Sequence, residues 1–176
     1  NLIAHNTRDP EERALDLRVQ IATNERGATA ARELIAQMGV EAVRRSIDDI
    51  IAYTQRRIRN RIAELKPGEY SFTNYLDDDG MGGDPVPIAV TVRVDGDRLS
   101  VDFTGSGKEA RGAMNMPTNA LNACVYYSVK ALLDPELLPN AGLFEAVSIS
   151  APPGTIVNPL PPAPVGARSI TCQKVA

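Results

Sequence analysis

The sequence is poor in the residue types that most often build a catalytic centre. Its 176 residues contain one histidine, two cysteines and no tryptophan. His5 has no neighbouring nucleophile motif such as G-x-S-x-G, so we interpret it as a solvated side chain near one end of the chain rather than as a catalytic base. Cys124 and Cys172 form no C-x-x-C pair or Cys/His cluster, which argues against a zinc site and a disulfide framework. Because Cys124 lies in an apolar segment, we interpret it as a buried, inert thiol.

Positive charge and long apolar runs are also scarce. The formal net charge is −3, which argues against a nucleic-acid or membrane-surface partner. The basic run QRRIRNR, residues 55–61, is interleaved with isoleucines at helical spacing and is interpreted as a solvated helix face. No apolar run approaches the roughly 18 residues of a membrane span, and no charged-then-apolar leader opens the chain. We therefore expect a cytoplasmic protein. Because the chain starts with Asn1 and stops at TCQKVA without a turn motif, we also expect a segment of a longer polypeptide.

Two helices are predicted in the first part of the chain. Asp9, Pro10 and Glu12 are typical of a helix start with a capping box, and this helix should run to Met38, with Gly39 as its stop. Gly27, near its middle, weakens the prediction of a single segment. Apolar residues then recur every three or four positions over residues 43–65, which predicts a second helix that ends before Pro67-Gly68. The very short link predicts an antiparallel helical hairpin over residues 1–68.

After residue 68 the apolar period changes from that of a helix to that of a strand. Residues 87–103 alternate on both sides of Asp95-Gly96, which predicts a β-hairpin, and EYSFTNYLDDD predicts a third antiparallel strand. A mostly buried helix should follow over Met116–Pro135, starting at Asn or Thr, then one strand in AVSISAPPGTIV and a proline-rich extended tail. The predicted fold class is α+β, with residues 69–176 as its second region. We expect the two regions to form one structural unit of a longer chain.

The stretch YLDDDGMGGDP, residues 75–85, looks most like a site. In a calcium loop beginning at Asp77, Met81 would occupy position five and Ile88 position twelve, so the essential bidentate acid is missing. Three adjacent carboxylates repel one another, and we interpret the stretch as an exposed connection between strands. The alternatives are the polar lip of a site whose other wall lies elsewhere and, more weakly, calcium binding by the aspartates.

The stretch TGSGKEARG, residues 104–112, resembles a phosphate-binding loop. A Walker A motif would need glycine at the position of Asp102 and serine or threonine at the position of Glu109. The same stretch matches G-x-G-x-x-A, but the strand before it belongs to a hairpin. Because Gly112 and Pro117 delay the next helix, a pyrophosphate would have no helix N-terminus to bind. Neither nucleotide motif is therefore expected to function here.

Several runs, in order, resemble the hydantoinase B family. They are RDPEERALDLRVQIATNERGA, YLDDDG, DGDRLSVDFTGSGKEARGAMNMP, ACVYYSVKALLDP, PNAGLFEAVSISAPPGTIVNPLPPAPVGAR and the final TCQ. This family includes the B-type subunit of N-methylhydantoinases, the matching half of 5-oxoprolinases and a subunit of acetone and acetophenone carboxylases. The resemblance covers nearly the whole chain and implies an internal segment of a longer B-type subunit.

The resemblance implies an ATP-dependent hydrolase of cyclic amides such as hydantoin or 5-oxoproline. A separate A-type subunit would bind ATP and phosphorylate an amide or ketone oxygen, which turns that oxygen into a leaving group. ATP and a divalent metal would act in the complete complex, and neither is expected to bind this segment, which should be inactive alone. The family's metal-binding segment lies ahead of the stretch matched here, so no catalytic or metal residue is assigned. The alternatives are a ketone carboxylase subunit and a non-catalytic interaction module.

The resemblance also places four residues on the family's DFTGS…RGxxN run. They are Asp102, Gly105, Arg111 and Asn115. We expect Gly105 to supply a positive φ and the amide of Asn115 to tie down the loop. The alternative is a wall that faces the substrate or the A-type subunit. Together with the aspartate run, the candidates for such a wall are Asp77, Asp78, Asp79, Asp102, Gly105, Arg111 and Asn115.

Overall fold

The computed structural model describes residues 2–176 and has the predicted α+β class. The chain forms two compact units, Asn1–Asp49 and Ile50–Ala176. The helix α3 (Val40–Ala63) begins in the first unit and continues in the second. The predicted division into regions 1–68 and 69–176 stays a prediction.

The first unit is helical. It contains α1 (Leu2–His5), α2 (Pro10–Met38) and the start of α3. The predicted first helix is confirmed as one continuous segment, and Gly39, with φ of 81°, ends it. The predicted capping box is wrong, because the Asp9 side chain makes no capping hydrogen bond. Asp9 has φ −123° and ψ 78°, outside the extended conformation typical of a cap, and the carboxylate of Glu12 lies 3.4 Å from Arg13 instead.

The second unit is built on a four-stranded sheet in the order β1-β2-β3-β4. The strands are β1 (Gly68–Leu76), β2 (Val86–Asp95), β3 (Arg98–Asp102) and β4 (Val147–Ser150). The predicted hairpin and third antiparallel strand are confirmed, since β2 pairs antiparallel with both β1 and β3. The strand β4 pairs parallel with β3, a direction that its short sequence did not reveal. The sheet is therefore mixed.

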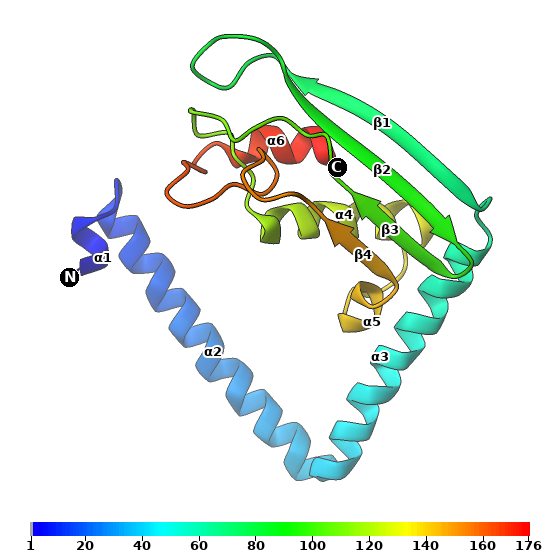
Figure 1. Ribbon diagram of the computed structural model, residues 1–176. Coiled ribbons are helices and arrows are strands. Elements are labelled where there is room, and N and C mark those ends of the chain that lie inside the picture. Colours follow the sequence, from blue (N-terminus) through cyan, green and yellow to red (C-terminus); the bar gives the residue numbers. More distant parts are fainter. Residues whose placement is uncertain (1) are drawn as a thin grey trace. The chain divides into compact units, whose positions relative to one another are not determined.

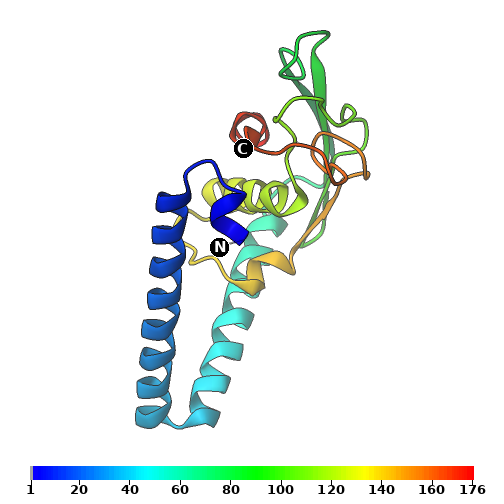
Figure 2. The same cartoon turned by 90° about the vertical axis from the view of Figure 1, so that its left-hand side faces the viewer.

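Two helices lie on one face of this sheet. They are α4 (Thr118–Leu133) and α6 (Arg168–Val175), and the two views in Figures 1 and 2 place both on the same side. The predicted helix over residues 116–135 is confirmed, and it begins at Thr118, in agreement with the expected Asn or Thr at its start. Its inner face is formed by Leu121, Val125 and Val129, whereas its outer face is exposed. The core between the sheet and these helices includes Ile88, Val94, Leu99, Val101, Phe103, Leu121, Val125 and Val129.

The helix α6 and the short α5 (Ala141–Phe144) were not predicted from the sequence. The helix α6 has only eight residues and little apolar periodicity, so tertiary contacts must fix it. Thr171, which is fully buried, donates a hydrogen bond from its hydroxyl to the Met114 carbonyl. The Ser128 hydroxyl of α4 lies 3.3 Å from the Ala176 carbonyl oxygen and ties the last turn to its neighbour.

The part of α3 that lies in the second unit is firmly packed. Ile58 and Ile62 are fully buried. Arg57 forms a bidentate ion pair with the buried carboxylate of Asp134, and its Nη2 lies 2.7 Å from Asp134 Oδ1. The interpretation of residues 55–61 as a merely solvated face is therefore wrong for Arg57 and also for Arg59, whose Nη1 lies 3.1 Å from Asp97 Oδ2, because acidic partners far away in sequence reach both. No helix in residues 2–176 combines the length and apolar character that a membrane crossing requires.

Candidate functional site

Two loops of the second unit meet at an ion pair. The first, residues 77–85, connects β1 to β2, and the second, residues 103–117, leads from β3 to α4. Arg111 Nε lies 2.7 Å from Asp79 Oδ2, and Arg111 Nη2 lies 3.4 Å from Asp79 Oδ1. The same Nη2 donates to the Gly82 carbonyl at 3.2 Å, and the Gly112 amide donates to the Asp79 carbonyl at 3.1 Å. Side-chain and backbone contacts thus hold the two loops together.

The three aspartates of the first loop have different surroundings. Asp77 is exposed, while Asp78 and Asp79 are half-buried. Asp78 Oδ1 accepts a hydrogen bond from the Gly80 amide at 2.6 Å, and Asp79 Oδ1 accepts one from the Met81 amide at 2.9 Å. Two successive Asx turns therefore fold the loop, which is a common use of aspartate in turns. This confirms the predicted connection between strands, although only Asp77 is as exposed as predicted.

The ion pair fixes the charge of both partners. The guanidinium of Arg111 and the Met81 amide hold the pKa of Asp79 below its usual value, and the carboxylate in turn raises the pKa of Arg111. The Arg111 side chain is nevertheless 73% exposed. Its Nη1 donates no hydrogen bond within residues 2–176, so it is available to an acceptor from outside. Such an oriented guanidinium suits a carbonyl oxygen, a carboxylate or a phosphate.

The buried side chain of Asn115 holds the second loop, residues 103–117, from the interior of the protein. Its side chain is fully buried and makes four hydrogen bonds. Its Oδ1 accepts from the Ala110 amide at 2.7 Å, and its Nδ2 donates to the carbonyls of Ala110, Gly112 and Pro164 at 2.8, 3.2 and 3.0 Å. The expectation that this amide ties down the loop is confirmed. Because three of the bonds bracket Arg111, the loop presents that side chain from a fixed backbone.

Close packing between the loops also requires glycine at position 112. A Cβ atom there would overlap the Asp79 carbonyl oxygen and lie 3.0 Å from Gly80 Cα. Both of these neighbours are backbone atoms of the first loop, which could not rotate away as a side chain can. A larger residue would therefore separate the two loops and stretch the contact between Asp79 and Arg111.

Asp102 and Gly105 lie outside this hydrogen-bond network. Asp102 Oδ1 accepts from the Ser150 hydroxyl at 2.6 Å and from the Thr104 hydroxyl at 3.0 Å, and these bonds lower the pKa of Asp102. The carboxylate therefore links the ends of β3 and β4. Gly105 has φ of 97°, which confirms the predicted positive φ. The structure thus brings Asp79, Arg111 and Asn115 together and places the other candidates elsewhere in the loops or at the strand ends.

All 176 residues match the family model described as hydantoinase B/oxoprolinase. The chain belongs to the hydantoinase B/oxoprolinase family. The resemblance stated from the sequence is confirmed. Among curated relatives, a protein described as the B component of a D-/L-hydantoinase, from Pseudomonas sp. (strain NS671), is 32% identical over 187 residues. The match covers 100% of this chain and 32% of that relative. The 5-oxoprolinase 1 of Arabidopsis thaliana is 29% identical over 184 residues, which are 96% of this chain and 14% of that protein.

Solved structures share the fold. An ATP-dependent caprolactamase from Pseudomonas jessenii matches with a TM-score of 0.77 and 26% identity, over 92% of this chain and 28% of that one. An acetone carboxylase in its nucleotide-free form gives the same TM-score of 0.77 at 19% identity, a likeness of fold alone, over 89% of this chain and 22% of that one. The chain thus spans about a third or less of the proteins that it matches.

The described part of this hydantoinase B family chain contains neither a group of metal ligands nor a glycine loop that leads directly into a helix. Within residues 2–176 no three His, Cys, Asp or Glu side chains are arranged to hold a metal. The loop 104–117 runs without helix until Thr118, as expected, so its glycines do not lead into a helix N-terminus. No chemical step is therefore assigned to a metal or nucleotide on these residues.

The thiols of Cys124 and Cys172, which are 48 positions apart in the sequence, are neighbours in the structure. Cys124 lies on α4 and Cys172 on α6, and both are half-buried free thiols. Burial and the neighbouring thiol of Cys172 raise the pKa of Cys124 to about 11. The interpretation of Cys124 as an inert thiol is consistent with this pKa, but the side chain is half-buried rather than buried, and its contact with the thiol of Cys172 was not predicted. Only the helix packing reveals the pair, because the sequence spacing carries no motif.

Proposed function

We propose that this chain is part of the B-type subunit of an ATP-dependent cyclic-amide hydrolase of the hydantoin or 5-oxoproline type. The observation that carries the proposal is the match of the family model to residues 1–176, together with the fold shared with the ATP-dependent caprolactamase. The reaction needs two functions, activation of the amide oxygen by ATP and hydrolysis of the activated ring. We assign ATP binding to an A-type partner subunit and place the complete complex in the cytoplasm.

Within this assembly we assign the Asp79–Arg111 pair to a wall that faces the substrate or the A-type subunit. The guanidinium is held at a defined position by Asp79 and by the Gly82 carbonyl, with the anchored loop behind it. Its free Nη1 suits an oxygen of the cyclic amide or a carboxylate on the partner. Prior ordering of the side chain reduces the entropy that would be lost on binding. Asp102 and Gly105 shape the neighbouring backbone, and Asp77 and Asp78 shape the entry loop.

The test uses the complete B-type subunit that carries this segment, mixed with an A-type subunit. Ring opening of hydantoin and 5-oxoproline is followed by chromatography, with and without ATP, alongside release of inorganic phosphate. We expect ring opening only with ATP and both subunits. Consumption of bicarbonate with a ketone, without ring opening of any cyclic amide, would instead support a carboxylase. If a complex that lacks this segment turned over cyclic amides at the normal rate, the segment would be interpreted as a non-catalytic interaction module.

Arg111→Gln tests the assignment of the loop pair. It should lower kcat/KM for ring opening at least ten-fold, and Asp79→Asn should lower it less, because the guanidinium then loses its orientation but keeps its charge. The control is Arg93→Gln. Arg93 forms a comparable exposed ion pair with Glu69, 2.6 Å apart, on β2 and β1, away from the two loops. An equal loss in both arginine variants would refute a specific role for Arg111.

A further inference from the structure

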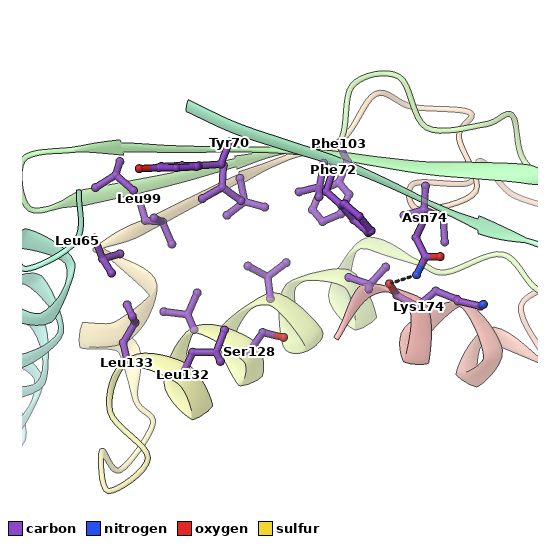
Figure 3. A pocket seen from close by; sticks show the side chains of 18 of the residues that line it. Leu65, Tyr70, Phe72, Asn74, Leu99, Phe103, Ser128, Leu132, Leu133 and Lys174 are labelled. Carbon is purple, nitrogen blue, oxygen red and sulfur yellow. Dashed lines mark hydrogen bonds between the residues drawn. The ribbon is translucent and has the colours of Figure 1, made fainter. Parts of the chain in front are cut away.

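A long apolar groove lies between the sheet and the helices α4 and α6. Its volume is about 500 Å³. The floor is formed by β1, β2 and β3, where Tyr70 stands opposite Val92 and Phe72 opposite Val90. Apolar side chains of α4 and Val175 of α6 form the opposite wall. Figure 3 shows Leu65 and Tyr70 toward one end and Asn74 and Lys174 toward the other.

The groove is open to solvent over part of its length. Phe72 is 68% exposed and Leu132 is 82% exposed, although both line it. Small-molecule sites usually bury most of their ligand, which a groove with such an exposed rim does not do. A polar cyclic amide would also find few hydrogen-bonding groups on these walls. Contiguous exposed apolar surface of this kind is typical of a site that binds another piece of polypeptide.

The charged groups of the groove are two lysines. Lys66 and Lys174 are the charged residues among its lining, and neither ammonium group forms an ion pair within residues 2–176. Their carbonyl oxygens accept hydrogen bonds from the Tyr70 hydroxyl at 2.9 Å and from Asn74 Nδ2 at 3.5 Å, so the two lysines flank opposite ends of the β1 floor. The groove therefore suits an apolar segment with negative charge near both of its ends.

The relatives show where such a segment could come from. The match covers 32% of the Pseudomonas sp. relative and 28% of the caprolactamase, so about two thirds of each polypeptide lies outside the matched stretch. An added helix would lie beside α4 and α6, and an amphipathic helix in an apolar groove is a recurrent mode of recognition. We propose that the groove binds the apolar face of an amphipathic helix, acidic near both ends, from the part of a hydantoinase B-type subunit that lies outside this stretch.

The test measures binding of peptides to this chain. Overlapping peptides of about 22 residues, or six helical turns, are made from the unmatched part of the Pseudomonas sp. relative and labelled for fluorescence anisotropy. We expect an amphipathic, acid-ended peptide to bind and to gain helical circular dichroism. Leu132→Asp and Phe72→Asp should each weaken its binding at least ten-fold, and Lys174→Glu should weaken it and reduce its dependence on salt.

Leu138→Asp is the matched control for Leu132→Asp. Leu138 is 81% exposed, follows the end of α4 and does not line the groove. It should leave peptide binding unchanged. Because these leucines and Phe72 are exposed, their variants should keep the unfolding midpoint of the parent chain, and urea titration of each variant checks this.

Three results would overturn the proposal. The first is the absence of binding by any peptide, and the second is a loss of binding that is equal in the Leu132 and Leu138 variants. The third is self-association of the chain in sedimentation velocity that Leu132→Asp abolishes, which would make a second copy the occupant. The proposal rests on family membership and needs no ATP in its test, so a complex that fails to open cyclic amides would leave the peptide result intact.

Discussion

Replacement of Asn115 by alanine tests whether one buried amide organises the loop that carries Arg111. The variant removes four hydrogen-bond contacts at once: Oδ1 accepts one, and the two N–H groups of Nδ2 are shared among three carbonyl oxygens. It also leaves the amide of Ala110, a residue that is only 5% exposed, without its partner. Alanine has no group that could replace either function, and the fully buried position limits repair by water.

The expected cost follows from general hydrogen-bond energetics. Each bond contributes roughly 0.5–1.5 kcal/mol net, and a buried donor left unpaired costs about 1–3 kcal/mol. Allowing for relaxation of the loop, we expect Asn115→Ala to lower the free energy of unfolding by about 3 kcal/mol, a large part of a typical total of roughly 5–15 kcal/mol. Asn115→Asp should cost at least as much, because its ionised carboxylate can accept but cannot donate to three carbonyl oxygens.

The assay is urea unfolding followed by circular dichroism, combined with hydrogen exchange of the Ala110 amide. Exchange at Ala110 should accelerate in Asn115→Ala, with smaller changes at amides in β2. The control is Asn119→Ala, since Asn119 is exposed and its side chain accepts only from the adjacent Ala120 amide, at 2.8 Å. The reasoning is refuted if Asn115→Ala changes the unfolding free energy by no more than Asn119→Ala does.

Three further predictions concern glycine, acid and thiol chemistry. Gly112→Ala should destabilise the chain in urea unfolding, because its Cβ overlaps the Asp79 carbonyl. Gly27→Ala should instead increase helical circular dichroism, because a Cβ there meets no atom within 4 Å apart from its chain neighbours and the nearby backbone of its own helix. The opposite pattern would contradict the packing of the loops. Asp134 has a lowered pKa, owing first to its hydrogen bonds with Arg57, so its contribution to stability is present above the ordinary value of about 4 and is lost as pH falls through the lower native value. Asp134→Asn should therefore reduce the acid dependence of the urea midpoint, and an unchanged acid limb would exclude this carboxylate as a cause. The rate of alkylation of Cys124 should be low at pH 8 and rise toward pH 11, as measured by mass spectrometry of the alkylated peptide. Cys172→Ser should shift this rise to lower pH, because it removes one cause of the raised pKa of Cys124. An unshifted profile would exclude contact between the thiols.

Much of the fold could be predicted from local patterns. The apolar spacing of α3, the stop at Gly39 and the alternation across Asp95-Gly96 each depend on nearby residues, and the corresponding elements formed as predicted. The helix α6 could not be predicted in this way, because its position depends on Thr171 and Met114, which are 57 residues apart. The parallel pairing of β4 with β3 likewise depends on a long connection that contains α4 and α5.

The site was only partly predictable for the same reason. Glycine and asparagine chemistry correctly indicated that Gly105 takes a positive φ and that Asn115 ties down its loop, since both are local properties. The pairing of Asp79 with Arg111 joins residues 32 positions apart, and nothing in either run of sequence specifies it. The partner of Arg57, Asp134, is 77 positions away and was missed as well.

The Asp79–Arg111 pair is better explained by orientation than by stability. The guanidinium of Arg111 is mostly exposed although Asp79 is half-buried, so water and salt screen their attraction and the pair adds little to the free energy of folding. The buried amide of Asn115 makes its own hydrogen bonds to the loop that carries Arg111, separate from the ion pair. The carboxylate instead fixes the orientation of the guanidinium. It accepts hydrogen bonds from Nε and Nη2, and it leaves Nη1 without a partner in the described chain. A fixed loop that carries an oriented guanidinium is suited to binding an oxygen atom of another molecule. The buried Asn115 fixes the loop and the exposed Arg111 offers the donor, and this is the structural basis for our assignment of Arg111 to a binding wall.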